Sequence, residues 1–192
     1  MPVHPLTPDR WAHLEALFGA NGACGGCWCM WWRVTAKEFE AGSAANRERM
    51  QAIVADGDRP PGLLAYEDGR PVGWVTVAPR EEFGRIERSR DLALLDGPVW
   101  SVPCFYVAAG QRGRGVASTL LDAVVRFAAR HGARTVEGYA VDPTRRRFTN
   151  SEAYTGTVSL FEAAGFTPAA QRTPSSRIVM RRDVSTARRR AR

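Results

Sequence analysis

The stretch from Cys104 to Arg130 constrains the fold more than any other part of the chain. It opens with the β-prone run Cys104–Val107, passes through the glycine-rich turn Gly110–Gly115 and continues as an amphipathic segment. The apolar residues of this segment recur at spacings of three and four, the period of one helical face; they are Val116, Leu120, Leu121, Val124, Val125, Phe127 and Ala128. The sequence therefore predicts a strand, a tight turn and a helix in succession.

The glycine-rich turn predicts a binding site for a phosphate or pyrophosphate group. Glycine has no Cβ, so the backbone there can approach a ligand closely. The first N–H groups of the following helix have no partner within the helix, and the helix dipole adds roughly half a positive charge at that end. Arg112 and Arg114 contribute two formal charges. Together these features favour an anionic ligand at the start of the helix.

The spacing of the glycines narrows the choice of ligand. Neither Gly-Lys-Ser nor Gly-Lys-Thr occurs, which excludes a nucleoside-triphosphate loop of that type, and Ser118 occupies the third glycine position of a G-x-G-x-x-G dinucleotide motif. The turn instead reads Arg112-x-x-Gly115-x-Ala117 directly after a strand. Taken alone, this pattern is also compatible with an ordinary strand-to-helix turn that needs glycine for steric reasons.

Two motifs together resemble those of a known family. Arg112-x-x-Gly115-x-Ala117 resembles the R/Q-x-x-G-x-G/A pyrophosphate loop of the GNAT superfamily of acyl-CoA-dependent N-acetyltransferases. Residues Ser159–Phe166, SLFEAAGF, resemble the late helix of that family, usually L-Y-E-K-x-G-F. The motifs stand at the usual separation and cover roughly the last half of the chain. The resemblance implies an α/β fold with a mixed, mostly antiparallel sheet flanked by helices, whose splayed central strand forms a cleft for CoA.

The order of expected elements agrees with such a layered α/β domain. We expect one domain over residues 1–184 and a basic, disordered tail over 185–192. The expected helices are 8–18, 35–54 (with a candidate break at Gly42–Ala44), 116–130 and 157–164. The expected strands are 63–67 and 72–77 (a hairpin around Asp68-Gly69), 99–107, 135–141, 166–172 and 177–182; Arg80–Arg90 and Arg145–Asn150 are expected to be loops, the first with a short helix as the alternative.

Composition limits the partners. The chain has 192 residues, of which 44% are hydrophobic and 24% charged, and no apolar run approaches the length of a membrane span. The segment Met1–Pro5 lacks the basic and apolar regions of a signal peptide, so a cytoplasmic protein is expected. We expect it to be a monomer or a homodimer. Four of the seven net positive charges come from Arg188, Arg189, Arg190 and Arg192, which leaves +3 for the rest. No aromatic residue accompanies these arginines, so no specific nucleic-acid partner is expected.

The family resemblance assigns the acetyl-CoA contacts residue by residue. In that family the splayed strand binds the pantetheine arm through its open backbone groups, and this role falls here on Phe105, Tyr106 and Val107. The pyrophosphate role falls on Gln111, Arg112, Gly113, Arg114, Gly115, Val116 and Ala117, with the hydroxyl of Ser118 as a further contact. An extended arm held in this way would bring the acetyl carbon to near-attack distance from an amine.

The late helix departs from the family pattern. Where the family often has a tyrosine that protonates the leaving thiolate of CoA, this chain has Phe161, whose ring is expected to face the sulfur without a hydroxyl. Three explanations are open. Tyr154 or Tyr106 supplies the hydroxyl, the thiolate leaves without an acid, or the protein binds acyl-CoA without transferring the acyl group. The sequence favours the second, because a thiol with a pKa of about 8.5 is a tolerable leaving group.

A general base is harder to assign from the sequence. The acceptor amine must lose a proton before it attacks, and the base must be within reach of it directly or through a water. Glu81 and Glu82 follow the expected hairpin, and Glu137 is on the strand beside the cleft. Each is also compatible with a solvated surface acid. The catalytic candidates are therefore Glu82, Glu137 and Tyr154; the three histidines form no recognisable constellation.

The segment Cys24-x-x-Cys27-x-Cys29 is unusual, and Cys104 is the only other cysteine. Zinc bound by all four is one interpretation, but structural zinc sites usually show two paired knuckles. The favoured interpretation is a packed apolar turn with no metal, because reduced cysteine behaves as a small hydrophobe. The resemblance implies that this connection lines the acceptor pocket, with Cys27, Trp28, Cys29, Trp31 and Cys104 as its residues.

The sequence thus predicts an N-acetyltransferase that moves an acetyl group from acetyl-CoA, as co-substrate, to an amine by direct transfer in a ternary complex. The acceptor is a small-molecule or peptide amine. Two alternatives come from other classes. One is a non-catalytic acyl-CoA-binding or sensing module, motivated by Phe161, and the other is a zinc-stabilised interaction domain built on the cysteines.

Overall fold

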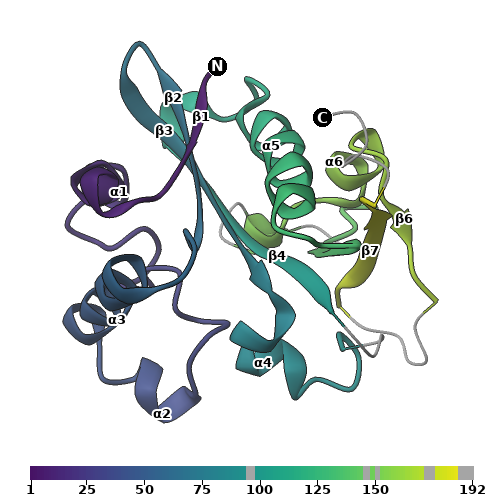
Figure 1. Ribbon diagram of the computed structural model, residues 1–192, viewed down its shortest axis with the longest axis horizontal. Helices are drawn as coiled ribbons and strands as arrows, with labels where there is room; N and C mark the ends of the chain where they lie inside the picture. Colours follow the sequence, from purple (N-terminus) through teal and green to yellow (C-terminus); the bar gives the residue numbers. More distant parts are fainter. Residues whose placement is uncertain (94–97, 145–147, 150–151, 171–175, 186–192) are drawn as a thin grey trace.

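The protein is built on one open seven-stranded sheet, flanked by helices on both faces (Figure 1). The computed structural model describes residues 1–93, 98–144, 148–149, 152–170 and 176–185. The strand order is β1-β2-β3-β4-β5-β7-β6, and β4 and β5 form the parallel pair among antiparallel neighbours. The strands are β1 Val3–Pro5, β2 Gly62–Glu67, β3 Arg70–Pro79, β4 Val99–Val107, β5 Thr135–Ala140, β6 Thr167–Pro168 and β7 Ile178–Asp183. This confirms the mixed, mostly antiparallel sheet.

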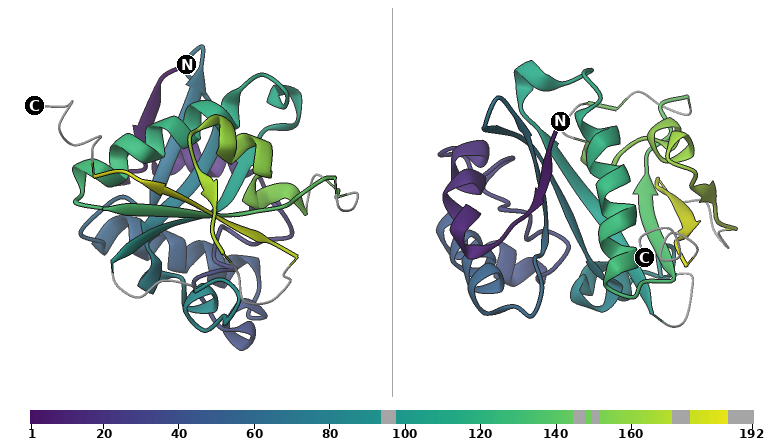
Figure 2. Two further views of the ribbon diagram at one scale, coloured as in Figure 1. Left: turned by 90° about the vertical axis from the view of Figure 1, so that its right-hand side faces the viewer. Right: turned by 45° about the horizontal axis from the view of Figure 1, so that its top comes forward.

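The helices form a layer on each face of the sheet. Figure 2 (right) shows α1 and α3 on one side of the strands and α5 on the other. The helices are α1 Trp11–Phe18, α2 Ala36–Phe39, α3 Ser43–Asp56, α4 Gly84–Glu87, α5 Val116–Arg130 and α6 Val158–Ala163. Their buried residues form separate apolar clusters with opposite faces of the strands, because successive side chains of a strand point to opposite sides.

Several local features agree with the sequence, and others do not. The helix expected over 35–54 is divided at Gly42, whose φ of 96° takes the chain out of the helical region. Thr35 and Glu38 form a capping box that starts the short α2. Arg80–Arg90 contains a 3-10 turn and α4. The strand β1 was not expected, and β6 has two residues where a strand over 166–172 was expected. Arg145–Arg147, Asn150 and the tail beyond Ser185 lie outside the described residues.

The central strand β4 diverges from β5 half-way along its length. The two strands pair from Val99 to Val102 only, after which β4 continues to Val107 in pairing with β3, while β5 continues in pairing with β7. Pro103 stands where the pairing ends, and proline has no N–H to donate to a neighbouring strand. The splayed central strand is thereby confirmed, and one backbone edge of Cys104–Val107 faces away from β3 without a strand partner among the described residues.

Candidate active site

A groove of about 1360 Å³ follows the open edge of β4. One end lies at the turn that begins α5, and the other lies between the cysteine segment and the chain around Tyr154. Its walls come from parts of the sequence that are far apart, mainly residues 23–32, 104–118 and 153–160, with Thr149 and with Arg177 just before β7. The groove therefore joins the predicted phosphate site to the predicted acceptor pocket.

The turn before α5 has the geometry of an anion site. Gly113 and Gly115 have φ of 73° and 78°, in the left-handed region that favours glycine, and Gly115 is the N-cap of α5. Gln111, Arg112 and Gly113 line the groove, as do Gly115, Val116, Ala117 and Ser118. This end of the groove thus combines the free N–H groups of a 15-residue helix with the charge of Arg112.

Arg114 differs from the sequence expectation. Its guanidinium group points to the β2–β3 hairpin, where its two terminal nitrogens lie 3.0 and 2.9 Å from the carboxylate oxygens of Glu67, and it also donates to Gln111 at 2.5 Å. Arg114 does not line the groove, whereas Arg112, two residues earlier, does. Arg112 instead donates from Nε to the carbonyl of Val107 at 3.3 Å, which keeps its side chain beside the end of β4.

The strand residues Phe105, Tyr106 and Val107 form the middle of the groove, together with Cys104. Phe105 packs with the α5 cluster, and Cys104 and Tyr106 pack toward α1. Because the backbone edge here has no strand partner, an extended ligand arm could pair with it as an added strand would.

Phe161 is not part of the groove wall, which corrects its assignment as a CoA contact. Its side chain is fully buried, and its ring lies 6.1 Å from that of Phe105 on β4. A Cβ added at Gly138 on β5 would lie 2.1 Å from atoms of the same ring. The ring therefore contacts both diverging strands, so its role in this structure is to pack between them, and glycine at position 138 is required by the ring.

The far end of the groove is lined by thiols and aromatic rings. Cys27, Cys29, Trp31 and Cys104 lie there as expected, together with Cys24. Trp28 does not: it is buried, donates from Nε1 to Ser43 Oγ at 3.1 Å and stacks on Trp11. The sequence reasoning missed the further wall residues Phe18, Phe39, Trp32, Trp74 and Arg177. Trp32, beside Trp31 in the same aromatic run, is the one that the pattern could have indicated.

Two of the thiols are held together by the tertiary structure. The Cys104 thiol is hydrogen-bonded to Cys29, and the indole Nε1 of Trp74 lies 3.3 Å from the Cys29 sulfur. These hydrogen bonds, with the nearby charge of Arg33, hold the pKa of Cys29 below its ordinary value, and the pKa of Cys104 is raised. Trp28 and Cys29 reach this position with φ of 43° and 60°, which is unusual for residues other than glycine. Within the described residues no group of three or more potential ligands is arranged to hold a metal ion.

Tyr154 lines the groove beside these thiols. Its ring lies 6.4 Å from that of Trp32, and the guanidinium of Arg177 lies 5.1 Å from its centre. Burial raises the pKa of Tyr154 to about 12, so its hydroxyl keeps its proton at neutral pH. Tyr154 can therefore donate a proton at this end of the groove.

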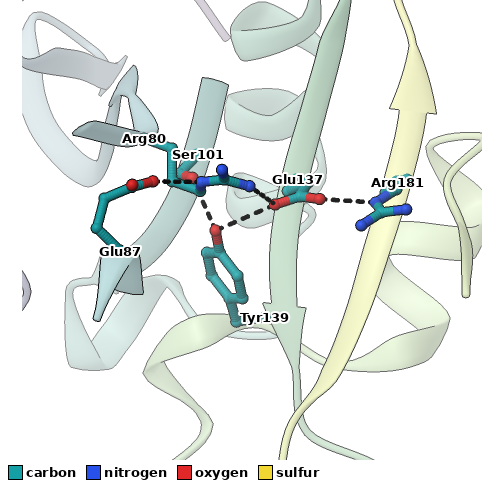
Figure 3. A network of polar contacts seen from close by, with 6 residues as sticks. All are labelled: Arg80, Glu87, Ser101, Glu137, Tyr139 and Arg181. Atoms are coloured by element: carbon teal, nitrogen blue, oxygen red, sulfur yellow. Dashed lines mark hydrogen bonds and ion pairs between the residues drawn. The ribbon is translucent and has the colours of Figure 1, made fainter. Parts of the chain in front are cut away.

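The two carboxylates named from the sequence, Glu137 (Figure 3) and Glu82, form ion pairs with arginines outside the groove. Glu137 is fully buried between Arg181, whose Nε is 2.6 Å from one carboxylate oxygen, and Arg80, whose Nη1 is 3.6 Å from the other. Tyr139 adds a contact at 3.5 Å. Glu82 is ion-paired with the buried Arg33 at 2.7 Å. Neither glutamate is a wall residue of the groove. These positions argue against both as the general base and for a structural role.

An open strand edge that leads from a helix N-terminus to a pocket is the arrangement that the sequence resemblance implies for an acyl-CoA-dependent acyltransferase. The comparisons with known proteins agree. The chain belongs to the acetyltransferase (GNAT) family, whose model matches residues 28–148. No curated protein matches the sequence.

Solved structures with the same fold include three acetyltransferases. The ribosomal-protein-alanine N-acetyltransferase from Brucella melitensis has a TM-score of 0.54 and 16% identity, with 95% of this chain and 99% of that chain covered. The PaiA N-acetyltransferase from Thermoplasma acidophilum, solved in complex with coenzyme A, has a TM-score of 0.54 and 12% identity, with 95% of this chain and 98% of that chain covered. The GNAT domain of PAT from S. lividans has a TM-score of 0.55 and 21% identity, with 94% of this chain and 89% of that chain covered. At these identities the likeness establishes the fold.

Among the described residues, none of the helices combines the length and the apolar character needed to cross a bilayer.

Proposed function

We propose that this protein is an N-acetyltransferase that moves the acetyl group of acetyl-CoA directly to an amine within a ternary complex. The observation that carries the proposal is the continuity of the groove from the α5 N-terminus, along the open edge of β4, to the pocket at Cys104 and Tyr154. A pyrophosphate at Gln111–Ser118 and a pantetheine arm along Phe105–Val107 would bring the thioester to that pocket. The reacting carbon would then lie among Cys104, Cys29 and Tyr154.

The surroundings of the pocket favour deprotonation of the amine without a carboxylate base. Apolar walls disfavour an ammonium group through desolvation. This effect lowers the pKa of a bound amine, so that the proton is lost to water on binding. The neutral amine attacks the carbonyl carbon and the C–N bond forms. The nitrogen then loses its surplus proton to water, and the C–S bond breaks with the electron pair on sulfur.

We further propose that Tyr154 protonates the leaving thiolate. The sequence alone favoured departure without an acid, but Tyr154 is a wall residue of the pocket and its hydroxyl keeps its proton. Replacement by Tyr154→Phe is expected to lower kcat by about a hundredfold at saturating acetyl-CoA, the usual contribution of a general acid, with unchanged CoA affinity. Tyr106→Phe, which removes the hydroxyl of the other tyrosine that lines the groove, is the matched control and should stay within about tenfold of the parent.

A Tyr154→Phe enzyme whose kcat remains within tenfold would show that the thiolate leaves unassisted. A large loss in Tyr106→Phe instead would assign the acid to β4.

The function itself is tested by following the release of free CoA from acetyl-CoA in the presence of single amines. Direct transfer predicts initial-rate lines that intersect when both substrates are varied, and an acetylated product detected by mass spectrometry. Parallel lines with acetyl groups on a cysteine would overturn the ternary-complex mechanism. Tight acetyl-CoA binding with no turnover on any amine would favour the second candidate, a non-catalytic acyl-CoA-binding module, for which Phe161 in place of tyrosine is the supporting observation.

A further inference from the structure

The acceptor end of the groove has an unusual balance of charge. Among its described wall residues there is no aspartate, glutamate or histidine, and the charged side chains are Arg112 and Arg177. Arg112 belongs to the phosphate end, so the acceptor end carries Arg177. Arg85 adds a second positive charge nearby, with its guanidinium carbon 3.9 Å from the ring centre of Trp31. A substrate with several positive charges would find no opposite charge on this wall.

The same wall provides hydrogen-bond donors for an anion. Arg177 is held over the rings of Tyr154 and Trp32, at 5.1 and 5.9 Å, and donates to Thr155 Oγ1. Trp32 is 8% exposed, and its indole Nε1 has no hydrogen-bond partner within the described part of the chain. A buried N–H without a partner costs about 1–3 kcal/mol, which an oxygen atom of a ligand would remove.

The remaining surface suits a flat apolar group. Trp31 is 40% exposed, which is uncommon for a ring of this size, and its edge meets Phe39 with centroids 5.1 Å apart. Trp32, Tyr154 and Phe39 also line this end. Aromatic walls of this kind gain most from an aromatic or bulky aliphatic partner.

We propose that the acceptor is a small amine that carries a carboxylate and an aromatic or bulky apolar body, and not a polycation. The carboxylate would be bound by Arg177 and the Trp32 indole, and the apolar body by Trp31 and Phe39. The inference rests on the proposed function, because it names the acceptor of that reaction. It accounts for the absence of acidic wall residues, which a site for a polyamine would need.

The test compares three probes that separate the two parts of the proposal. Phenylalanine carries the ring, the amine and the carboxylate; 2-phenylethylamine lacks the carboxylate; spermidine is a polycation. We expect kcat/KM to fall at least about tenfold from phenylalanine to 2-phenylethylamine, the usual effect of losing a hydrogen bond to a charged group, and to be lower still for spermidine. The affinity of each amine for the protein saturated with CoA, measured by calorimetry, should follow the same order.

Two variants locate the effect. Arg177→Ala should lower kcat/KM for phenylalanine at least about tenfold. The kcat/KM for 2-phenylethylamine should stay within about twofold of the parent value. Trp32→Phe, which keeps a ring and deletes the N–H, should show the same selectivity with a smaller loss. Arg126→Ala, an exposed arginine of α5, is the matched control and should change neither substrate.

The outcomes distinguish this inference from the proposed function. Preference for spermidine in both turnover and binding would overturn the inference while N-acetylation stands. The expected binding order without turnover on any amine would support the inference and overturn the proposed function. Equal loss for both phenyl probes in Arg177→Ala, or no binding of either probe, would overturn the carboxylate site.

Discussion

Gly115→Glu is expected to abolish acetyl-CoA binding. Gly115 is the N-cap of α5 and lines the phosphate end of the groove, and a Cβ built there meets no atom within 4 Å. The Cβ of a glutamate therefore meets no neighbour, although its backbone is strained at this φ, and its carboxylate places a negative charge beside the pyrophosphate. Two unit charges 5 Å apart repel by about 3 kcal/mol at an effective dielectric constant of 20, which is a loss of more than about a hundredfold in affinity. Calorimetry with acetyl-CoA measures this loss.

Two control variants separate charge from backbone strain. Gly115→Ala places a non-glycine residue at the same φ of 78°, which costs about 1–2 kcal/mol of stability. It adds no charge, so most of the affinity for acetyl-CoA should remain. Arg114→Ala removes a charge that is paired with Glu67 outside the groove, and it should change CoA affinity by less than about threefold. Unchanged affinity in Gly115→Glu would show that the pyrophosphate does not bind at this turn.

Glu137→Ala is expected to destabilise the fold by about 3–5 kcal/mol. The substitution removes the carboxylate that Arg181 contacts and one of the carboxylates that Arg80 contacts, and removal of one member of a buried ion pair typically costs this amount. For a chain of this length each kcal/mol lowers Tm by about 2–4 °C, so a fall of about 6–20 °C is expected in a thermal melt. Glu137→Gln, which keeps the shape and part of the hydrogen bonding, should lose less.

A surface pair provides the control for this experiment. Glu67→Ala breaks the partly exposed pair with Arg114 and should cost at most about 1 kcal/mol. Turnover of Glu137→Gln, measured well below its melting temperature, should remain within about tenfold of the parent. A variant at position 137 with the parent Tm and a thousandfold lower kcat would show that this carboxylate acts in catalysis after all.

The local signals of the sequence agreed with the structure wherever neighbouring residues settle the conformation. The apolar period of Val116–Ala128 produced α5, Asp68-Gly69 produced the tight turn of the β2–β3 hairpin, and Gly42 separates α2 from α3. The glycine spacing at 113 and 115 indicated the turn at which we propose that the pyrophosphate binds. These features depend on backbone sterics and on hydrogen bonds between residues that are close in sequence, so a linear pattern contains the information.

The assignments that changed all concern where a side chain points after distant segments meet. Arg112 and Arg114 are equivalent in the sequence, but Glu67, 47 residues earlier, draws Arg114 out of the groove. In the sequence Glu137 is a plausible base, but in the structure it is ion-paired with Arg80 and Arg181. Phe161 is a plausible CoA contact in the sequence, but its ring packs against Gly138 and Phe105.

The proposed acceptor pocket exists only in three dimensions. Cys29, Cys104 and Tyr154 come from three separate parts of the chain, and they line one groove beside the point where β4 diverges from β5 at Pro103. By itself the sequence determined the strand, the turn and the helix that can bind a phosphate. The tertiary structure decided which charges face that groove and which are neutralised, because a charge or a ring acquires its partners only when the whole sheet is packed.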